Sequence, residues 1–315
     1  KTFLVGSVLC LAGSAAFALT GPSFRWLIFW RVLMGVGSGL YVVALTTYQT
    51  LGIPDSIRGS AFSLISAGGI VTLVTFVPLA DFFLKKGWPL SYVWFVPLLT
   101  LYALACGLRL PEIDIPQKEG GERDLSLPAL AKKPGIRVLL ASVTVFSMTD
   151  ACLLAIGGVA SERGLLPSLF LTANATIGLL VRIGGRKILD VLPRRQMAAP
   201  AIAVTSLGLF AASFSEGNVA YALCGILFGV AMGFGFPLHM ALIGDVAEPR
   251  HRAGVASLVW FLMGACFFIV PILLGSLAGL LGTAGAFRAL TLALFASSFG
   301  VFLLWNPRYS FRRSH

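Results

Sequence analysis

Charged residues are scarce in this sequence of 315 residues. Asp, Glu, Lys and Arg make up 12% of the chain, whereas about a quarter of the residues are charged in an average soluble domain. Hydrophobic residues make up 57%, and the mean hydropathy is +0.89. No water-soluble fold of this length has an interior large enough for so much apolar surface. The composition therefore excludes a soluble domain and indicates a chain that lies partly in lipid.

The sequence also lacks the residue spacings that are typical of metal, redox and hydrolytic sites. None of the five cysteines belongs to a C-x-x-C pair, and each lies in an apolar run, so we interpret them as buried core residues. The three histidines do not have zinc-site spacing, and the sequence contains neither a phosphate-binding P-loop nor a G-x-S-x-G motif. We therefore predict no cofactor, no metal and no enzymatic activity.

Long apolar runs without strand-like alternation predict an all-α, polytopic membrane protein. A helix needs roughly 20 mostly apolar residues to cross a bilayer. Ten runs meet this requirement, and Pro78, Pro237 and Pro271 lie inside them, where proline is expected to kink a helix. The predicted spans are residues 3–20, 26–51, 60–84, 91–109, 135–160, 168–189, 197–214, 219–246, 253–281 and 285–305.

One polar segment, residues 110–134, divides four of these spans from the other six. It is rich in proline, glycine and charge, a composition that is typical of a linker. The sequence thus predicts a partial N-terminal bundle at 1–109, a cytoplasmic linker at 110–134 and a six-helix C-terminal bundle at 135–315.

The positions of Lys and Arg predict the orientation of the chain. If Lys1 is cytoplasmic and the ten spans alternate, most basic residues fall on the cytoplasmic side, as the positive-inside rule requires. This arrangement explains the net charge of +11 without nucleic acid. We expect a multi-pass protein of the cell inner (plasma) membrane, surrounded by lipid, with both termini cytoplasmic. The basic residues expected outside are Arg25, Lys85, Lys86, Arg163 and Arg288.

An internal repeat relates the two parts of the chain. A shift of 194 residues places GVGSGL (35–40) on GVAMGF (229–234) and IRGSAFSL (57–64) on HRAGVASL (251–258). Because two separate clusters share one register, we interpret the halves as parallel copies of one bundle.

The repeat gives two local expectations. The pairs Gly35/Gly39 and Gly229/Gly233 are expected to let helices approach closely. Arg58 and Arg252 lie in short cytoplasmic turns, where arginine binds either helix-end carbonyl groups or carboxylates.

The same shift aligns Arg195 with Lys1. The second half has two spans before Arg195, so two more spans are expected before residue 1, for a total of twelve.

Two segments carry a family resemblance. RVLMGVGSG contains Arg31 followed by Gly35 and Gly37, and RIGGRKILDVLPRR contains an aspartate, Asp190, followed by two arginines. These segments resemble the fourth-helix and cytoplasmic-turn motifs of the major facilitator superfamily, although the glycines of its antiporter motif are missing around Pro78. The resemblance implies two six-helix bundles that move a solute by alternating access through a polar pathway at their seam.

Several polar residues inside the spans are candidates for that pathway. Asp150, near the middle of its span, is interpreted as a proton or cationic-substrate site, or as a hydrogen-bond partner of a neighbouring helix. The resemblance implies that Arg31 faces the central cavity and takes part in proton coupling; the alternative is a fixed structural partner. His239 either titrates and binds substrate or is a satisfied buried histidine. Asn174, Tyr41, Tyr48 and Gln49 either line the cavity or join helices.

A second candidate set lies at the cytoplasmic side. These residues are expected to form a charge network that holds the inward-closed state and breaks as the bundles rock. They are Asp190, Arg194, Arg195, Arg182, Arg58 and Arg252.

The sequence therefore favours a secondary active transporter of a small organic solute, with proton-coupled efflux as the specific hypothesis. The partners would be lipid, a small-molecule substrate and protons. The alternative is a truncated or non-transporting membrane scaffold, since two spans of the expected twelve do not occur in the chain.

Overall fold

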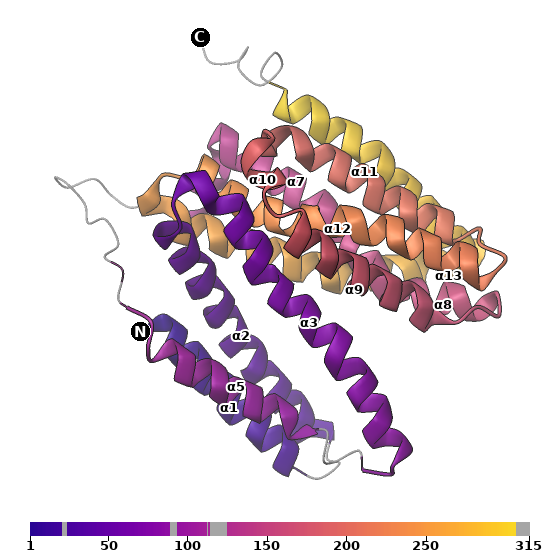
Figure 1. Ribbon diagram of the computed structural model, residues 1–315, viewed down its shortest axis with the longest axis horizontal. Coiled ribbons are helices and arrows are strands. Elements are labelled where there is room, and N and C mark those ends of the chain that lie inside the picture. Colours follow the sequence, from indigo (N-terminus) through magenta and orange to yellow (C-terminus); the bar gives the residue numbers. More distant parts are fainter. Residues whose placement is uncertain (21–23, 89–92, 112, 114–124, 307–315) are drawn as a thin grey trace. The chain divides into compact units, whose positions relative to one another are not determined.

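The computed structural model describes residues 1–20, 24–88, 93–111, 113 and 125–306 (Figure 1). These residues form helices and connecting turns, and no strand occurs among them, which confirms the predicted all-α class. The helical segments are α1 (Thr2–Leu19), α2 (Phe24–Gly52), η1 (Asp55–Ile57), α3 (Arg58–Lys85), α5 (Phe95–Gly107), α6 (Leu127–Lys132), α7 (Pro134–Ala151), η2 (Cys152–Ala155), α8 (Ile156–Glu162), α9 (Pro167–Gly184), α10 (Ile188–Val191), α11 (Arg194–Ala212), α12 (Asn218–Val246), η3 (Pro249–His251) and α13 (Arg252–Trp305).

Within the described residues, each predicted span coincides with a helix or with a run of helices, and the first two residues of the span at 91–109 lie outside them. Helices α7, η2 and α8 follow one another through a single predicted span, and α13 covers two. The two parts of α13 meet at Gly282, whose φ of 71° is non-helical and is readily adopted by glycine. Among the described residues, six helical stretches are long and apolar enough to cross a membrane by length and composition, and α5 is a shorter apolar helix.

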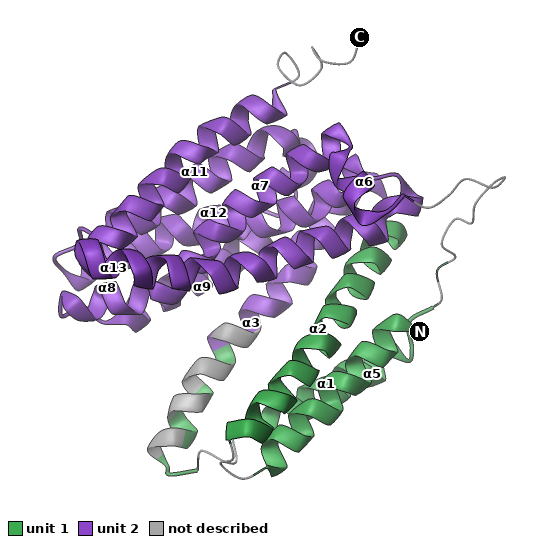
Figure 2. Cartoon of the chain, turned by 180° about the vertical axis from the view of Figure 1, so that it is seen from behind, with its two compact units in different colours: residues 1–52, 75–117 green, residues 53–74, 118–315 purple. Residues whose placement is uncertain are grey.

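The chain divides into two compact units, shown in different colours in Figure 2. Unit 1 comprises residues 1–52 and 75–117, and unit 2 comprises residues 53–74 and 118–315. The beginning of α3 therefore packs with the C-terminal helices. Within the predicted linker, residues 127–132 form helix α6, while 112 and 114–124 lie outside the described residues. The predicted bundles at 1–109 and 135–315 stay a prediction.

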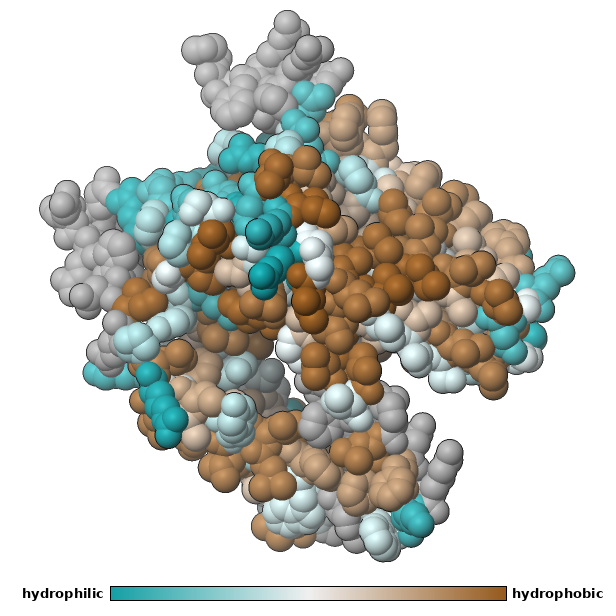
Figure 3. Space-filling model, viewed as in Figure 1, coloured by the Kyte–Doolittle hydropathy of each residue, from teal (hydrophilic) through white to brown (hydrophobic). Residues whose placement is uncertain are grey.

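Unit 2 has an apolar core between its long helices. Large aromatic side chains of α7, α9, α12 and α13, among them Phe146, Phe170, Phe228 and Phe287, are fully buried there. Other aromatic side chains of α13 point outward, and Phe261 and Phe268 are more than 70% exposed. Figure 3 shows apolar side chains over much of the viewed face. Such a surface is expected where lipid replaces water as the solvent.

Glycine allows α1 and α2 of unit 1 to pack backbone against backbone. A Cβ on Gly6 would lie 2.7 Å from the amide nitrogen of Tyr41, and one on Gly37 would lie 2.8 Å from that of Cys10. The predicted contact pair was wrong here, because added Cβ atoms on Gly35 and Gly39 meet no described atom within 4 Å. Residues two apart on a helix are about 200° apart around its axis, so Gly37 faces α1 while Gly35 and Gly39 face away.

The second predicted pair does form a close contact, between α9 and α12. A Cβ on Gly229 would lie 2.7 Å from the carbonyl oxygen of Asn174, and one on Gly233 would lie 2.7 Å from Cγ1 of Val181. The repeat therefore predicted the glycine packing correctly in unit 2 and selected the wrong helix face in unit 1.

This difference predicts opposite effects of alanine at two neighbouring positions. Gly37→Ala should destabilise the protein by about 1–3 kcal/mol because its methyl group overlaps the α1 backbone. Gly35→Ala should be neutral or stabilising by up to about 1 kcal/mol because alanine favours helix and the site is open. Melting temperatures of the two variants in the same detergent test this prediction, and equal shifts would contradict it.

Candidate functional site

A charge network at one end of unit 2 joins α3, the α9–α11 connection and α12. We define this charge network as Asp55, Arg58, Asp190, Arg194 and Asp245. Asp245, at the end of α12, accepts a hydrogen bond of 2.9 Å from Nη1 of Arg58 and bonds of 2.9 Å from Nη1 of Arg194 to both carboxylate oxygens. Arg58 also pairs with Asp55, the first residue of η1. One carboxylate thus bridges two arginines from segments far apart in the sequence.

Asp190 extends this network to the beginning of α3. It accepts a hydrogen bond of 3.1 Å from the backbone N–H of Ser60 and one of 3.3 Å from Nη2 of Arg194. The first turn of a helix has unpaired N–H groups and a positive dipole end, so a carboxylate is favourable there. Arg194 in turn donates from Nε to the carbonyl of Leu189 at 2.8 Å.

Two glycines permit this close approach. A Cβ on Gly244 would lie 2.6 Å from Nε of Arg58, and one on Gly59 would lie 2.6 Å from Cβ of Leu189. The side chain of Arg58 is only 1% exposed. Its guanidinium is therefore enclosed by α12 and depends on the carboxylates of the network for compensation of its charge.

The structure brings together only part of the predicted network. Arg58, Asp190 and Arg194 are joined, whereas Arg195 and Arg182 form no ion pair among the residues that the structure describes. Arg252 donates to the carbonyls of Ala247 and Gly244 at the end of α12, at 3.3 Å and 3.2 Å. The sequence predicted that each of these repeat-related arginines binds either carboxylates or helix-end carbonyls. Arg58 binds carboxylates, and Arg252 binds helix-end carbonyls.

Arg195 and Arg182 have different surroundings. The guanidinium of Arg195 lies over the ring of Trp305, 5.8 Å from its centroid. Arg182 lies deeper in unit 2 and donates to the carbonyl oxygens of Ser66 on α3 and Met232 on α12.

Asp245 and Asp55 were missed by the sequence reasoning. Asp245 lies in the last turn of α12, and Asp55 follows the end of α2, so both lie where the chain turns back after a long apolar run. An acidic residue at the end of a span, close to a basic turn, is a signal that would have found them.

Asp150 lies where α7 changes its helix type. The α-helix ends at Ala151, and a 3₁₀ segment begins at Cys152. Asp150 is a half-buried residue, and its carboxylate makes no hydrogen bond that the structure shows with another described residue.

His239 is completely buried between α7 and α12. Its Nδ1 lies 2.7 Å from the carbonyl of Gly235, its Nε2 lies 2.9 Å from Oγ of Ser142, and the ring stacks on Phe146 at 4.5 Å. Because a carbonyl only accepts, Nδ1 carries a proton and Nε2 accepts from the serine hydroxyl in the neutral ring. This geometry favours the alternative of a satisfied buried histidine over a substrate contact.

The other pathway candidates lie on α9 and α2. Asn174 is 9% exposed, and its backbone packs on Gly229. Tyr41 is half-buried and its ring lies 4.7 Å from that of Phe3. Tyr48 and Gln49, on the last two turns of α2, are also half-buried.

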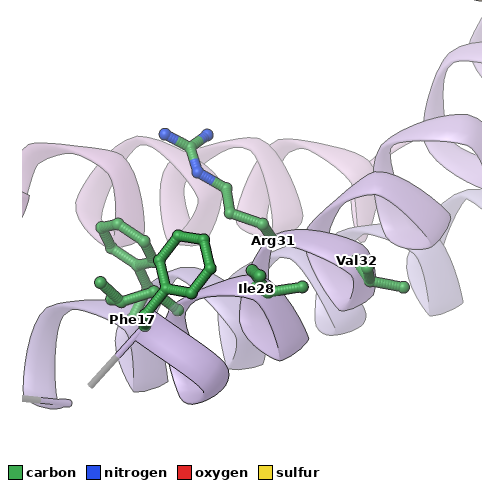
Figure 4. A pocket seen from close by; sticks show the side chains of 6 residues that line it. Phe17, Ile28, Arg31 and Val32 are labelled. Atoms are coloured by element: carbon green, nitrogen blue, oxygen red, sulfur yellow. The ribbon is translucent and has the colours of Figure 1, made fainter.

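Arg31 borders an open, mainly apolar recess of about 420 Å³ within unit 1 (Figure 4). Its guanidinium lies 5.2 Å from the ring centroid of Phe17, and Ile28 and Val32 are further lining residues. A cation over an aromatic face is favourable but does not neutralise the charge. The sequence predicts that these residues of unit 1 line one pathway with Asp150 of unit 2, and this stays a prediction.

Comparison with known proteins places the chain among membrane transporters. The sequence profile of the Major Facilitator Superfamily matches residues 1–257, and no curated protein sequence matches the chain. Among solved structures, a variant of the fucose:proton symporter FucP of E. coli has a TM-score of 0.79 at 14% identity, covering 97% of this chain and 83% of that one. FucP in an outward conformation has a TM-score of 0.76 at 14% identity, with 97% and 82% covered.

A further similar structure is the human organic anion transporter TETRAN. It has a TM-score of 0.75 at 15% identity, and the alignment covers 95% of this chain and 76% of that one. At such identities the likeness concerns the fold alone.

The bridging position of Asp245 predicts a large effect of its removal. Asp245→Asn leaves the buried guanidinium of Arg58 and the partly buried guanidinium of Arg194 without their shared carboxylate, and it should lower the free energy of unfolding by about 3 kcal/mol. Asp55→Asn is the matched control, because the Asp55 side chain is 81% exposed, and it should cost less than about 1 kcal/mol. Thermal unfolding in detergent measures both values. A shift for Asp55→Asn as large as that for Asp245→Asn would refute the assignment of Asp245 as the bridge.

Proposed function

The chain belongs to the major facilitator superfamily, and we propose from this that it is a secondary active carrier of a small organic solute. It is a multi-pass membrane protein by family and by its apolar helices. The observation that carries the proposal is the family match over residues 1–257, together with ionisable side chains inside spanning helices. In the proposed mechanism the solute passes by alternating access, in which a binding site opens to one side of the membrane at a time.

The proposed coupling ion is the proton, and the proposed direction is efflux. Two groups support the choice of the proton. Asp150 has no hydrogen bond that the structure shows and lies at the break between an α-helix and a 3₁₀ segment. Among the described residues, the contact shown for the guanidinium of Arg31 is the aromatic ring of Phe17. Ionisable groups at membrane depth are costly to keep, so they are candidates for function.

The charge network has a proposed role as a gate. It attaches the beginning of α3 to the α9–α11 connection and to α12 through one central carboxylate. Alternating access requires contacts that are stable in one state and broken in the other. Ion pairs that become hydrated after separation satisfy this requirement, because water then replaces each lost partner.

We further propose that this gate faces the cytoplasm of a cell whose inner (plasma) membrane holds the protein. The basic residues of the α9–α11 connection, Arg186, Lys187, Arg194 and Arg195, support this orientation through the positive-inside rule. Both ends of the chain are then cytoplasmic.

Transport by reconstituted protein tests the function. Proteoliposomes containing the protein should move at least one member of a panel of sugars, organic anions and organic cations, and the rate should rise when a proton gradient is imposed. Arg31→Gln should reduce the gradient-driven rate by roughly tenfold or more, corresponding to a loss of about 1.4 kcal/mol or more. Arg25→Gln is the matched control, since Arg25 is an exposed arginine at the beginning of the same helix.

Three results of this experiment have different meanings. Transport that ignores the proton gradient would remove proton coupling and leave the carrier. Equal loss in the Arg25 and Arg31 variants would remove the specific role of Arg31. No movement of any solute would favour the non-transporting scaffold.

Labelling of intact cells tests the orientation. Glu162 and Lys187 are exposed residues just beyond the two ends of α9. A membrane-impermeant maleimide should label Glu162→Cys in intact cells, whereas Lys187→Cys should react only after permeabilisation. The unmodified protein provides the background from the five native cysteines. The reverse pattern would invert the orientation.

A further inference from the structure

The indole N–H of Trp305 is a buried donor without an acceptor. Trp305 is the last residue of α13, and it is 9% exposed. Its Nε1 is covered by protein and has no hydrogen-bond partner among the residues that the structure describes. An indole nitrogen can only donate, and a buried donor that stays unpaired is costly. An acceptor from outside the described residues would therefore be favourable here.

Arg195 places a positive charge beside this donor. Its guanidinium lies 5.8 Å from the centroid of the Trp305 ring, where the beginning of α11 lies beside the end of α13 (Figure 1). Arg195 is exposed, and it forms no ion pair within the described part of the chain. The first turn of α11 contains no acidic residue. The two side chains thus offer hydrogen-bond donors and one positive charge to an anion that the protein itself does not supply there.

The sequence around this site is rich in basic residues. Arg186 and Lys187 belong to the α9–α11 connection, and the sequence that follows the described residues adds Arg308, Arg312 and Arg313 without an acidic residue. Basic residues that directly flank a spanning helix attract anionic phospholipids. The surroundings therefore favour a ligand with a net negative charge over a zwitterionic one.

Exposed apolar side chains lie close to the two donors along the chain. Val191 and Leu192 come just before α11, and Phe302 and Leu304 belong to the last turn of α13; all four are exposed. A free phosphate ion gains nothing from such surfaces, whereas the acyl chains of a phospholipid can cover them. Tryptophan is enriched at the boundary between lipid and water, where its ring is apolar and its N–H polar.

We propose that Arg195 and Trp305 bind the phosphate group of an anionic phospholipid at this end of unit 2. One phosphate oxygen accepts hydrogen bonds from the guanidinium, and another accepts the N–H of the indole. Because Nε1 is covered in the structure, binding requires side chains at the site to shift, and the exposed side chain of Arg195 can do so at small cost. This lipid site goes beyond the proposed function, since it does not require that the protein moves a solute.

Binding of single lipids tests the site. Native mass spectrometry in a non-ionic, phosphate-free detergent measures the affinity for phosphatidylglycerol, which should exceed that for zwitterionic phosphatidylcholine by about fivefold or more. Arg195→Gln should weaken the binding of phosphatidylglycerol roughly tenfold, which is the effect of one hydrogen bond to a charged group. Lys187→Gln is the matched control, because Lys187 is an exposed basic residue of the α9–α11 connection, and it should change the affinity by less than about threefold.

A change confined to the indole N–H tests the second donor. β-(3-benzothienyl)alanine in place of Trp305 keeps the shape of the ring and has sulfur where the indole has N–H. Because this N–H has no partner in the described structure, the replacement should leave the lipid-free melting temperature unchanged. It should nevertheless lower the affinity for phosphatidylglycerol roughly tenfold. Trp305→Phe should show the same loss of lipid binding, and Trp260→Phe, on the same helix, is the control for a smaller ring.

Three outcomes would overturn the inference. Equal losses in the Lys187 and Arg195 variants would mean a diffuse attraction of the basic surface for anions. A lower lipid-free melting temperature with the sulfur analogue would mean that the N–H already has a partner. Displacement of phosphatidylglycerol by an equal concentration of inorganic phosphate would mean a site for the free ion.

Transport is scored separately on the same preparations. Specific lipid binding by a protein that moves no solute would support this inference and contradict the proposed function. Transport by a protein that binds both lipids equally would do the opposite.

Discussion

A guanidinium keeps its proton at every physiological pH, so each arginine buried among these helices must find its compensation inside the protein. Arg58 finds it in two carboxylates, Arg252 bonds carbonyls at the end of α12, and Arg182 bonds the carbonyls of Ser66 and Met232. These three solutions differ in strength. Ion pairs at the helix ends can be replaced by water when helices separate, whereas Arg182 has no such replacement while it stays buried.

Close backbone packing is the second constraint, and it determines where the charges can lie. Gly244 and Gly59 leave room for the buried side chain of Arg58 and for the contact with Leu189. Gly229 brings α12 against α9 at Asn174, two turns of helix from Arg182. In a bilayer there is little hydrophobic drive for one helix to bind another, so such small residues at the contacts contribute much of the association. Glycine and arginine therefore act together at the attachment of α3.

The internal repeat was an uneven guide to individual contacts. It related Arg58 to Arg252 and Gly35 to Gly229 by one shift of 194 residues. Nevertheless, Arg58 bonds carboxylates while Arg252 bonds carbonyls, and Gly35 faces away from α1 while Gly229 packs on α9. Positions related by this shift lie at corresponding places along their helices. The side chains that surround them differ, because the neighbouring helices have different sequences.

Composition and hydrophobic run length were sufficient to determine the class of protein, the positions of its helices and, through short motifs, its family. These properties are local or additive, because any helix that crosses lipid needs the same length and the same lack of charge. The site was only partly predictable: Asp190 and Arg194 followed from their motif, whereas Asp245 and Asp55 did not. Only the tertiary structure decided that one carboxylate joins Arg58 to Arg194, and that the beginning of α3 packs with the C-terminal helices. Such pairings depend on which helix faces are turned toward each other, and that choice is made by the packing of the whole unit.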